Sequence, residues 1–314
     1  MGLVARRPEG QSDPMSRIPE SRGVVPPSLQ VAPAPDHPDL TRRMTGIDHA
    51  GAPVETSVTV EHALTLFLNG QEIVTMMTIG DHPECLAVGY LTNQNMLRAD
   101  DEITAVEVDG TRGHVFVKTA RRTDYEWKLK RRTLTSGCAQ GTAFGDVMER
   151  FDQVRLDPDA RLQTSWLYAL SRQINQTPSL YLAAGAIHGC VLCEQDRPLI
   201  YMEDVGRHNA VDKIAGYMRL NGVSPVGKCF YTTGRLTSEM VIKTVQMELP
   251  ILISRSGFTA SGVDLARQAN LTLIGRARGK RFIRLSGAER LVFDQDPDTV
   301  AEEERGRNRK GATQ

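Results

Sequence analysis

One cysteine lies in a polar loop near the middle of the chain, and its surroundings favour a reactive thiol. Cys138 stands in the run TSGCAQGT at residues 135–142, shortly after Arg131 and Arg132. Nearby cations favour the thiolate, which is the nucleophilic form of cysteine. A loop of Gly, Ser, Thr and Gln offers no apolar surface for burying the side chain. We therefore predict that Cys138 is a nucleophile; the alternative is a small residue in a turn.

A second group of reactive residue types lies where a predicted strand meets a predicted helix. The run EDVGRHNA at residues 203–210 contains the candidate ligand-binding residues Asp204, Gly206, Arg207, His208 and Asn209. In open α/β sheets ligands bind at the carboxyl ends of the strands, and a helix N-terminus attracts anions. The alternative is that an Asp or Asn of this run only caps the helix.

The next strand-to-helix junctions repeat this pattern. Gly234 and Arg235 follow predicted strand 228–233, and Arg255 follows predicted strand 251–254. Three polar junctions with one basic residue each predict a single rim that binds phosphate or another anion. A further basic run follows the next strand and consists of Arg276, Ala277, Arg278, Gly279, Lys280, Arg281 and Phe282. It could neutralise a pyrophosphate, or it could be a solvated turn.

The four other cysteines are predicted to be packing residues. Cys190 and Cys193 form a CxxC pair, but they lie in a predicted strand, where residues i and i+3 face opposite sides. A zinc site would need a second ligand pair at suitable spacing, and the sequence contains none. Cys85 lies in a predicted helix and Cys229 in a predicted strand. We therefore expect no tightly bound metal.

The order of predicted elements indicates an α/β protein with a β-rich N-terminal region. Beyond residue 145, strands alternate with helices such as 209–220, 238–248 and 263–270, which is typical of parallel pairing. Earlier, Asn69-Gly70 and Asp109-Gly110 predict hairpin turns. Nine of the 16 prolines precede residue 54, which predicts a disordered leader. The predicted regions are a leader (1–55), a β-rich subdomain (56–135), an α/β domain (136–293) and a charged tail (294–314).

Composition narrows the class of protein further. The 314 residues carry 38 Lys and Arg against 38 Asp and Glu, whereas a nucleic-acid binder normally has a basic excess. No apolar run is long enough to span a membrane, and no secretory signal precedes the body. Five cysteines in a chain of this length indicate a reducing, cytoplasmic compartment. We expect neither nucleic acid nor membrane as a partner.

Taken together, these residues resemble the formate dehydrogenase accessory sulfurtransferase family, FdhD, over about residues 57–291. The run at 203–213 is the most diagnostic part of the resemblance. The other matching stretches are Arg131-Arg132 through Cys138, residues 185–188, Gly234-Arg235 with Glu239, and Arg278 through Phe282.

The resemblance implies a cytidine deaminase-like α/β domain with an added β-rich N-terminal region. It implies a cytoplasmic homodimer that takes persulfide sulfur from a cysteine desulfurase and passes it to a molybdenum or tungsten bis(molybdopterin guanine dinucleotide) cofactor, later inserted into formate dehydrogenase. Cys138 matches the persulfide cysteine, and the 204–209 and 278–282 segments match ligand-binding segments. Many relatives carry a second loop cysteine where this chain has Gly141, so a one-cysteine relay is expected.

Three other functions remain alternatives. A cofactor-binding chaperone without catalysis would not need Cys138. A zinc-dependent deaminase would need His-x-Glu and Pro-Cys-x-x-Cys, yet Cys190 stands two residues after His188 and no proline precedes a CxxC. A dithiol oxidoreductase would need a reducible disulfide between Cys190 and Cys193.

Overall fold

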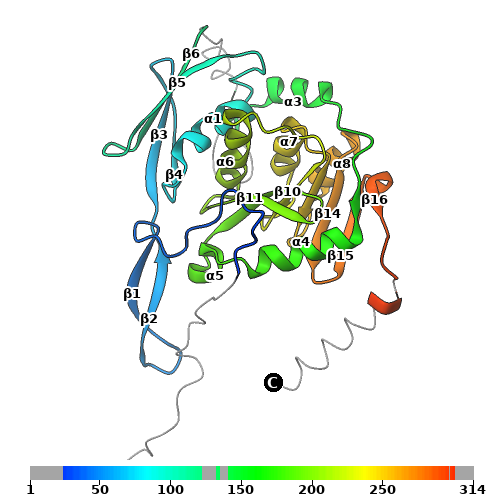
Figure 1. Cartoon of the computed structure of the whole chain (residues 1–314). Coiled ribbons are helices and arrows are strands. Elements are labelled where there is room, and N and C mark those ends of the chain that lie inside the picture. Colours follow the sequence, from blue (N-terminus) through cyan, green and yellow to red (C-terminus); the bar gives the residue numbers. More distant parts are fainter. Residues whose placement is uncertain (1–23, 122–131, 135–140, 297, 301–314) are drawn as a thin grey trace, which may run out of the picture.

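A mixed sheet of six strands forms the centre of the computed structural model, which describes residues 24–121, 132–134, 141–296 and 298–300 (Figure 1). In spatial order the sheet runs β11-β10-β12-β13-β14-β15. Its strands are β10 (His188–Glu194), β11 (Arg197–Asp204), β12 (Lys228–Thr232), β13 (Ile251–Ser254), β14 (Thr272–Arg278) and β15 (Arg281–Ser286). β12, β13 and β14 are parallel, and β10 is antiparallel to both β11 and β12. Consequently β11, β12, β13 and β14 all end at the same edge of the sheet.

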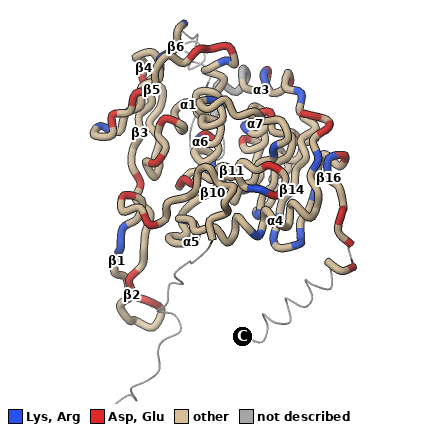
Figure 2. The backbone as a smooth tube through the Cα atoms, in the orientation of Figure 1, with Lys and Arg blue, Asp and Glu red and all other residues tan. Residues whose placement is uncertain are grey.

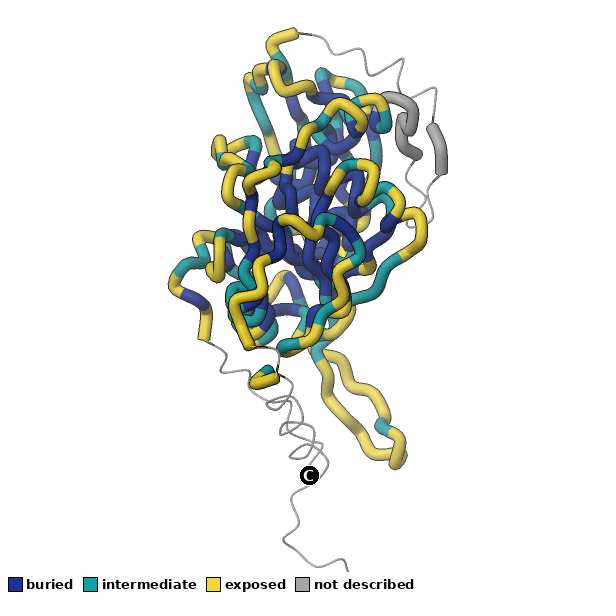
Figure 3. Tube along the Cα trace, turned by 90° about the vertical axis from the view of Figure 1, so that its right-hand side faces the viewer, coloured by how far each residue is buried: buried dark blue, intermediate teal, exposed yellow. Residues whose placement is uncertain are grey.

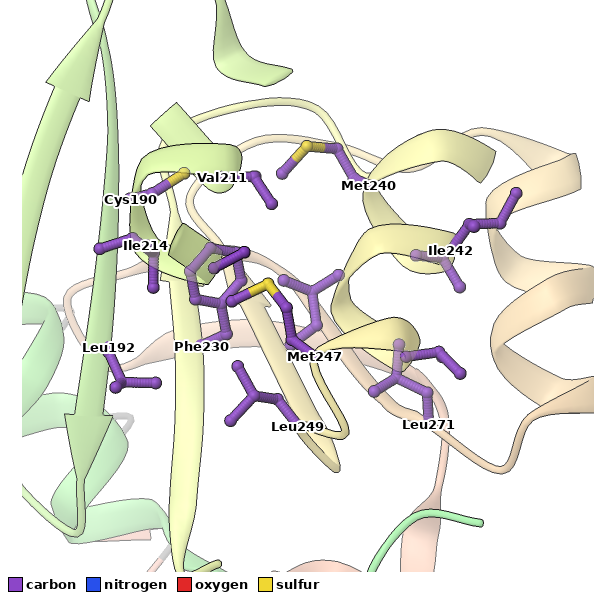
Figure 4. Packing of buried hydrophobic residues seen from close by; sticks show 14 of the residues in the cluster. Cys190, Leu192, Val211, Ile214, Phe230, Met240, Ile242, Met247, Leu249 and Leu271 are labelled. Carbon is purple, nitrogen blue, oxygen red and sulfur yellow. The ribbon is translucent and has the colours of Figure 1, made fainter. Parts of the chain in front are cut away.

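Helices cover both faces of this sheet, which confirms the predicted α/β architecture. One face packs against α6 (Arg207–Leu220), α7 (Ser238–Gln246) and α8 (Ala260–Gln268), with α3 (Phe144–Gln153) beside them. The other face packs against α4 (Thr164–Gln176). Figure 4 shows the first of these cores, in which side chains of strands and helices interdigitate. The predicted helices 209–220, 238–248 and 263–270 correspond to α6, α7 and α8, with ends that differ by up to three residues.

The cysteines of the sheet lie as their spacing predicts. Cys190 packs in the core under α6 and α7, whereas Cys193 packs on the opposite face with Cys229, its direct partner across β10 and β12. All three thiols and that of Cys85 are buried and free. Burial raises the pKa of Cys85 and of Cys190 to about 12. These thiols are therefore packing residues and poor nucleophiles.

The N-terminal region has its own four-stranded sheet, in the order β4-β3-β6-β5 within the described residues. The strands are β3 (His62–Leu68), β4 (Gln71–Thr78), β5 (Ile103–Asp109) and β6 (His114–Thr119), and α1 (Pro83–Asn93) covers one face. Asn69 and Gly70 both have positive φ between β3 and β4, as the predicted turn requires. α1 crosses α6 so closely that a Cβ on Gly89 would lie 1.7 Å from the Asp212 carbonyl oxygen.

The prediction of a disordered leader through residue 55 is wrong for residues 24–55. Backbone hydrogen bonds from Gln30 to Leu199 and from Tyr201 to Val31 hold the proline-rich segment against the edge of the central sheet. β1 (Thr41–Ile47) and β2 (Pro53–Thr59) then form an antiparallel hairpin, the β1–β2 ribbon. Figure 3 shows this ribbon extending from the body with nearly its whole length exposed. Proline-rich sequence reads as disorder, but an extended segment can pair with an edge strand, because its other amides stay free.

The tail boundary also needs a correction. Asp294, predicted as the start of a solvated tail, accepts hydrogen bonds from the hydroxyls of Thr164 and Ser165 and from the Ser165 amide. This carboxylate therefore caps the first turn of α4.

The remaining elements are α5 (Leu180–Ala184), β7 (Arg132–Leu134), β8 (Gly141–Ala143), β9 (Leu162–Gln163), β16 (Leu291–Val292) and a 3-10 turn at Ala288–Arg290. Within the described ranges, no helix is both long and apolar enough to cross a bilayer.

Candidate functional site

An arginine lies after, or near the end of, each of the four strands that end at the same edge of the central sheet. Arg207 follows β11, Arg235 follows β12, Arg255 follows β13, and Arg276 stands at a bulge in β14. We call these four residues the arginine rim. The structure thus brings together the three junctions predicted to form one anion-binding edge and adds the start of the basic run.

Short hydrogen bonds join the loops of the rim to one another. The Ser254 hydroxyl donates to the Gly234 carbonyl at 2.6 Å, and the Arg276 amide donates to the Ser256 carbonyl at 2.7 Å. A Cβ on Gly234 would lie 3.2 Å from the Arg207 Cβ. Glycine is therefore the residue that lets the β12 loop pass close to the start of α6, so that the arginines share one edge.

Two histidines of this edge are held neutral. Burial lowers the pKa of His208 to about 2, assisted by the charges of Lys243 and Arg207. Burial also lowers the pKa of His188, and Arg207 and Arg235 lower it further. The positive charge of the rim therefore comes from its arginines at neutral pH.

His208 faces inward, toward a buried polar network between α6 and α7. Its Nε2 lies 3.1 Å from Glu239 Oε2. Lys243, one turn further along α7, contacts both Glu239 at 4.0 Å and the fully buried Asp212 at 2.7 Å. The Asn93 amide of α1 donates to the same Asp212 at 2.7 Å. The imidazole is thus placed among groups that join three helices.

Asp204 and Asn209 are also turned into the protein. The fully buried Asp204 carboxylate accepts hydrogen bonds from the Thr78 hydroxyl at 2.5 Å and from the Asn209 amide at 3.1 Å. It also pairs with Lys213 at 2.6 Å, and Lys213 makes a second ion pair with Asp81. This arrangement joins the N-terminal sheet to the start of α6, which begins after Gly206 without a side-chain cap. Arg207 is the member of the 204–209 run that belongs to the arginine rim.

The guanidinium of Arg255 is held by a chain of contacts that starts at a buried carboxylate. The Glu203 carboxylate accepts hydrogen bonds from the backbone amides of Leu180 and Tyr181 at 2.8 and 3.1 Å, and these bonds fix the start of α5. Burial raises the pKa of Glu203 to about 7. The Tyr181 ring lies 5.0 Å below the Arg255 guanidinium, which also donates to Asn175 at 3.1 Å. These contacts orient the guanidinium by a cation–π interaction.

The basic run forms the turn between β14 and β15, visible as blue segments in Figure 2. Arg278 pairs with Arg281 across the hairpin, and Lys280 lies 5.9 Å from the Tyr168 ring of α4. Phe282 is half-buried near Tyr168, with ring centroids 6.4 Å apart, while Ala277 is buried. The hairpin thus extends the positive edge beyond the strands on the α4 side.

Cys138 lies outside the described residues, so its predicted role stays a prediction. The elements around it are β7 and β8, which pair with each other, and α3, which follows directly. The Gln246 side chain, at the end of α7, lies 3.5 Å from the Val147 carbonyl in the first turns of α3. Because α7 begins at the rim, α3 lies at the far end of that helix.

Sequence reasoning missed several partners of the site. Asp81, Asn175, Tyr168 and Tyr181 hold charged residues of the site, yet each is a common residue type in an ordinary helix or turn. Only their tertiary positions give them a role. Among the described residues, no three His, Cys, Asp or Glu side chains are placed to hold a metal.

The chain is similar to proteins of one family over most of its length. The family model described as FdhD/NarQ matches residues 59–292. "Sulfur carrier protein FdhD" of Listeria innocua is 30% identical over 242 residues, covering 76% of this chain and 93% of that protein. The protein of the same name from Bacillus subtilis is 31% identical over 245 residues, covering 76% and 91%. A crystal structure of a formate dehydrogenase accessory protein from Desulfotalea psychrophila superposes with a TM-score of 0.65 at 26% identity, covering 80% of this chain and 98% of that one.

Proposed function

Because this chain belongs to the FdhD/NarQ family, we propose that it is a sulfur carrier whose transfer residue is Cys138. In this proposal Cys138 accepts persulfide sulfur from a cysteine desulfurase. The protein delivers that sulfur to the bis(molybdopterin guanine dinucleotide) cofactor of molybdenum or tungsten before the cofactor enters formate dehydrogenase. The reaction belongs to the cytoplasm, where thiols stay reduced.

The arginine rim is the observation that carries the cofactor part of this proposal. Each guanine dinucleotide half of the cofactor contains a pyrophosphate, and arginine forks bind phosphate oxygens in pairs. Arg207, Arg235, Arg255 and Arg276 lie at successive strand ends, where open α/β sheets bind ligands. The basic turn 276–282 continues the same charge toward α4. A large ligand with two dianionic pyrophosphates could therefore bind along this edge.

The sulfur step requires only one thiol on this protein. The Cys138 thiolate attacks the terminal sulfur of the donor persulfide, a new S–S bond forms, and the donor cysteine leaves as a thiolate. No oxidant is consumed, because the sulfane sulfur changes partner without a net change in redox state. Gly141 at the position of a second loop cysteine is compatible with this one-thiol chemistry.

Mass spectrometry of the loaded protein tests the sulfur step. The purified protein is mixed with a cysteine desulfurase and free cysteine, and added sulfur is mapped without reductant. We expect one extra sulfur on Cys138, none in Cys138→Ala, and normal loading in the control Cys190→Ala, whose thiol is buried. Sulfur on another residue, or none, removes the carrier role of Cys138.

Calorimetry with GDP tests the rim separately. Arg235→Ala removes one exposed rim arginine and should weaken binding about ten-fold, the effect of one charge-assisted phosphate contact. Arg284→Ala on β15 removes an exposed arginine outside the rim and should leave affinity unchanged. Equal affinities for all three proteins would place the phosphate elsewhere. Full support of formate dehydrogenase by Cys138→Ala, with GDP binding intact, would favour the cofactor chaperone.

A further inference from the structure

An exposed aromatic ring lies beside the basic turn between β14 and β15. Phe293, directly after β16, is 67% exposed and stacks on Phe282 of β15, with ring centroids 6.3 Å apart and ring planes at 27°. Phe282 is half-buried, and its ring lies 6.4 Å from the Tyr168 ring of α4. The three rings follow one another from α4 to the surface, and Phe293 is the outermost. We call Phe282 and Phe293 the aromatic platform.

The chain holds Phe293 in place from both sides. Before it, Val292 of β16 pairs with Gln163 of β9. After it, the Asp294 carboxylate accepts hydrogen bonds from the amide and the hydroxyl of Ser165, at the start of α4. Figure 1 shows β15 and β16 on the same side of the central sheet. Most of the Phe293 ring stays in solvent, so burial contributes little to the fold here. A ring already held in position can bind a flat partner with little loss of conformational entropy.

The surface next to the aromatic platform is strongly basic. Five of the nine residues 276–284 are Lys or Arg, and none is acidic. Arg281 directly precedes Phe282 and pairs with Arg278 across the hairpin, and both arginines are exposed. Cations beside an exposed ring are the two features that bind a nucleotide, because the cations bind the phosphates and the ring stacks on the base. A second copy of this surface would bring two basic turns together about a two-fold axis, so the charge disfavours self-association here.

We propose that Phe293, supported by Phe282, is the residue on which the guanine base of the cofactor stacks while its pyrophosphate lies on the adjoining basic edge. This inference rests on the cofactor binding proposed above and adds a residue to it. Arginine and lysine contacts hold the phosphates, and the ring binds the base. Stacking is tolerant of base identity, because every base has a π face. Phe293 therefore makes the site select a nucleotide over bare phosphate or pyrophosphate.

Calorimetry of the full-length protein with two ligands tests this role. GDP carries both a base and a pyrophosphate, whereas inorganic pyrophosphate lacks the base, so wild type should bind GDP more tightly. Phe293→Ala should weaken GDP binding about ten-fold, the effect of one stacked base, and leave pyrophosphate binding unchanged. Phe116→Ala is the matched control, because Phe116 stacks on Phe67 at 4.8 Å on the N-terminal sheet, and it should change neither affinity. Circular dichroism and melting temperature verify that both variants are folded.

Phe293→Trp keeps a stacking surface and adds a fluorescent reporter. It should retain GDP affinity, and GDP should quench its fluorescence more than that of wild type, whereas pyrophosphate should not. A Phe293→Ala protein that binds GDP as tightly as wild type, or that loses affinity for GDP and pyrophosphate equally, overturns the proposal. A wild-type protein that binds neither ligand overturns the proposed phosphate site together with it. Sulfur loading of Cys138 is measured in parallel, so that failure of the aromatic platform is distinguished from failure of the proposed carrier function.

Discussion

Lys213 offers the strongest test of how the start of α6 is held. The side chain is fully buried, and its Nζ donates to the Glu203 carbonyl at 2.9 Å and pairs with Asp204 at 2.6 Å and with Asp81. Although burial alone would lower it, these two carboxylates raise the pKa of Lys213 above its ordinary value. The stabilisation is therefore fully present below about pH 10.5 and is lost only as the pH rises through that higher value.

Lys213→Met keeps the length of the side chain and removes the charge. It leaves the buried Asp204 carboxylate without its cation, a change that costs about 3–5 kcal/mol in measured cases. For a body of this size each kcal/mol lowers the melting temperature by about 2–4 °C, so we expect a fall of about 6–20 °C. Thermal and urea unfolding at pH 7.5 measure the fall in melting temperature and in unfolding free energy.

Lys118→Met is the control. Lys118 pairs with Glu107 at 2.7 Å, but both side chains are more than half exposed, so the loss of unfolding free energy should stay below about 1 kcal/mol. A Lys213→Met variant as stable as Lys118→Met would falsify the argument that this lysine offsets a buried charge.

Three further predictions concern packing, titration and thiol reactivity. Gly89→Ala should cost about 3 kcal/mol or more in urea unfolding, because its Cβ would meet the backbone of α6, whereas Gly110→Ala, with open space around it, should change little. Glu203→Gln should gain stability relative to wild type, by up to about 3 kcal/mol, as the pH rises from 4.5 to 7. In that window the unfolded wild-type carboxyl ionises, which favours unfolding, while the folded carboxyl, with its pKa near 7, stays protonated; parallel curves would refute this. A thiol reagent should label Cys138 in the native protein and reach Cys190 only after denaturation, as peptide mapping would show.

Much of the α/β body could be predicted because its signals are local. Alternating strands and helices, and the Asn69-Gly70 turn, are properties of neighbouring residues. The strand CVLC places Cys190 and Cys193 on opposite faces by its period of two, and the structure confirms this. Local signals also misled, since the prolines before residue 54 suggested disorder where the chain pairs with the edge of the sheet.

The sequence by itself determined which residue types stand at the strand ends, and therefore that arginines would gather at one edge of a parallel sheet. Only the tertiary structure decided which neighbours of those arginines face solvent and which face the core. Asp204 and Asn209 meet Thr78 and Met77 of β4, more than 120 residues earlier in the chain. The packing of the N-terminal sheet and α1 against α6 creates those contacts, and pairings between such distant segments leave no periodic pattern in the sequence. That packing turns Asp204 and Asn209 inward and leaves Arg207, which is only 9% exposed, at the rim.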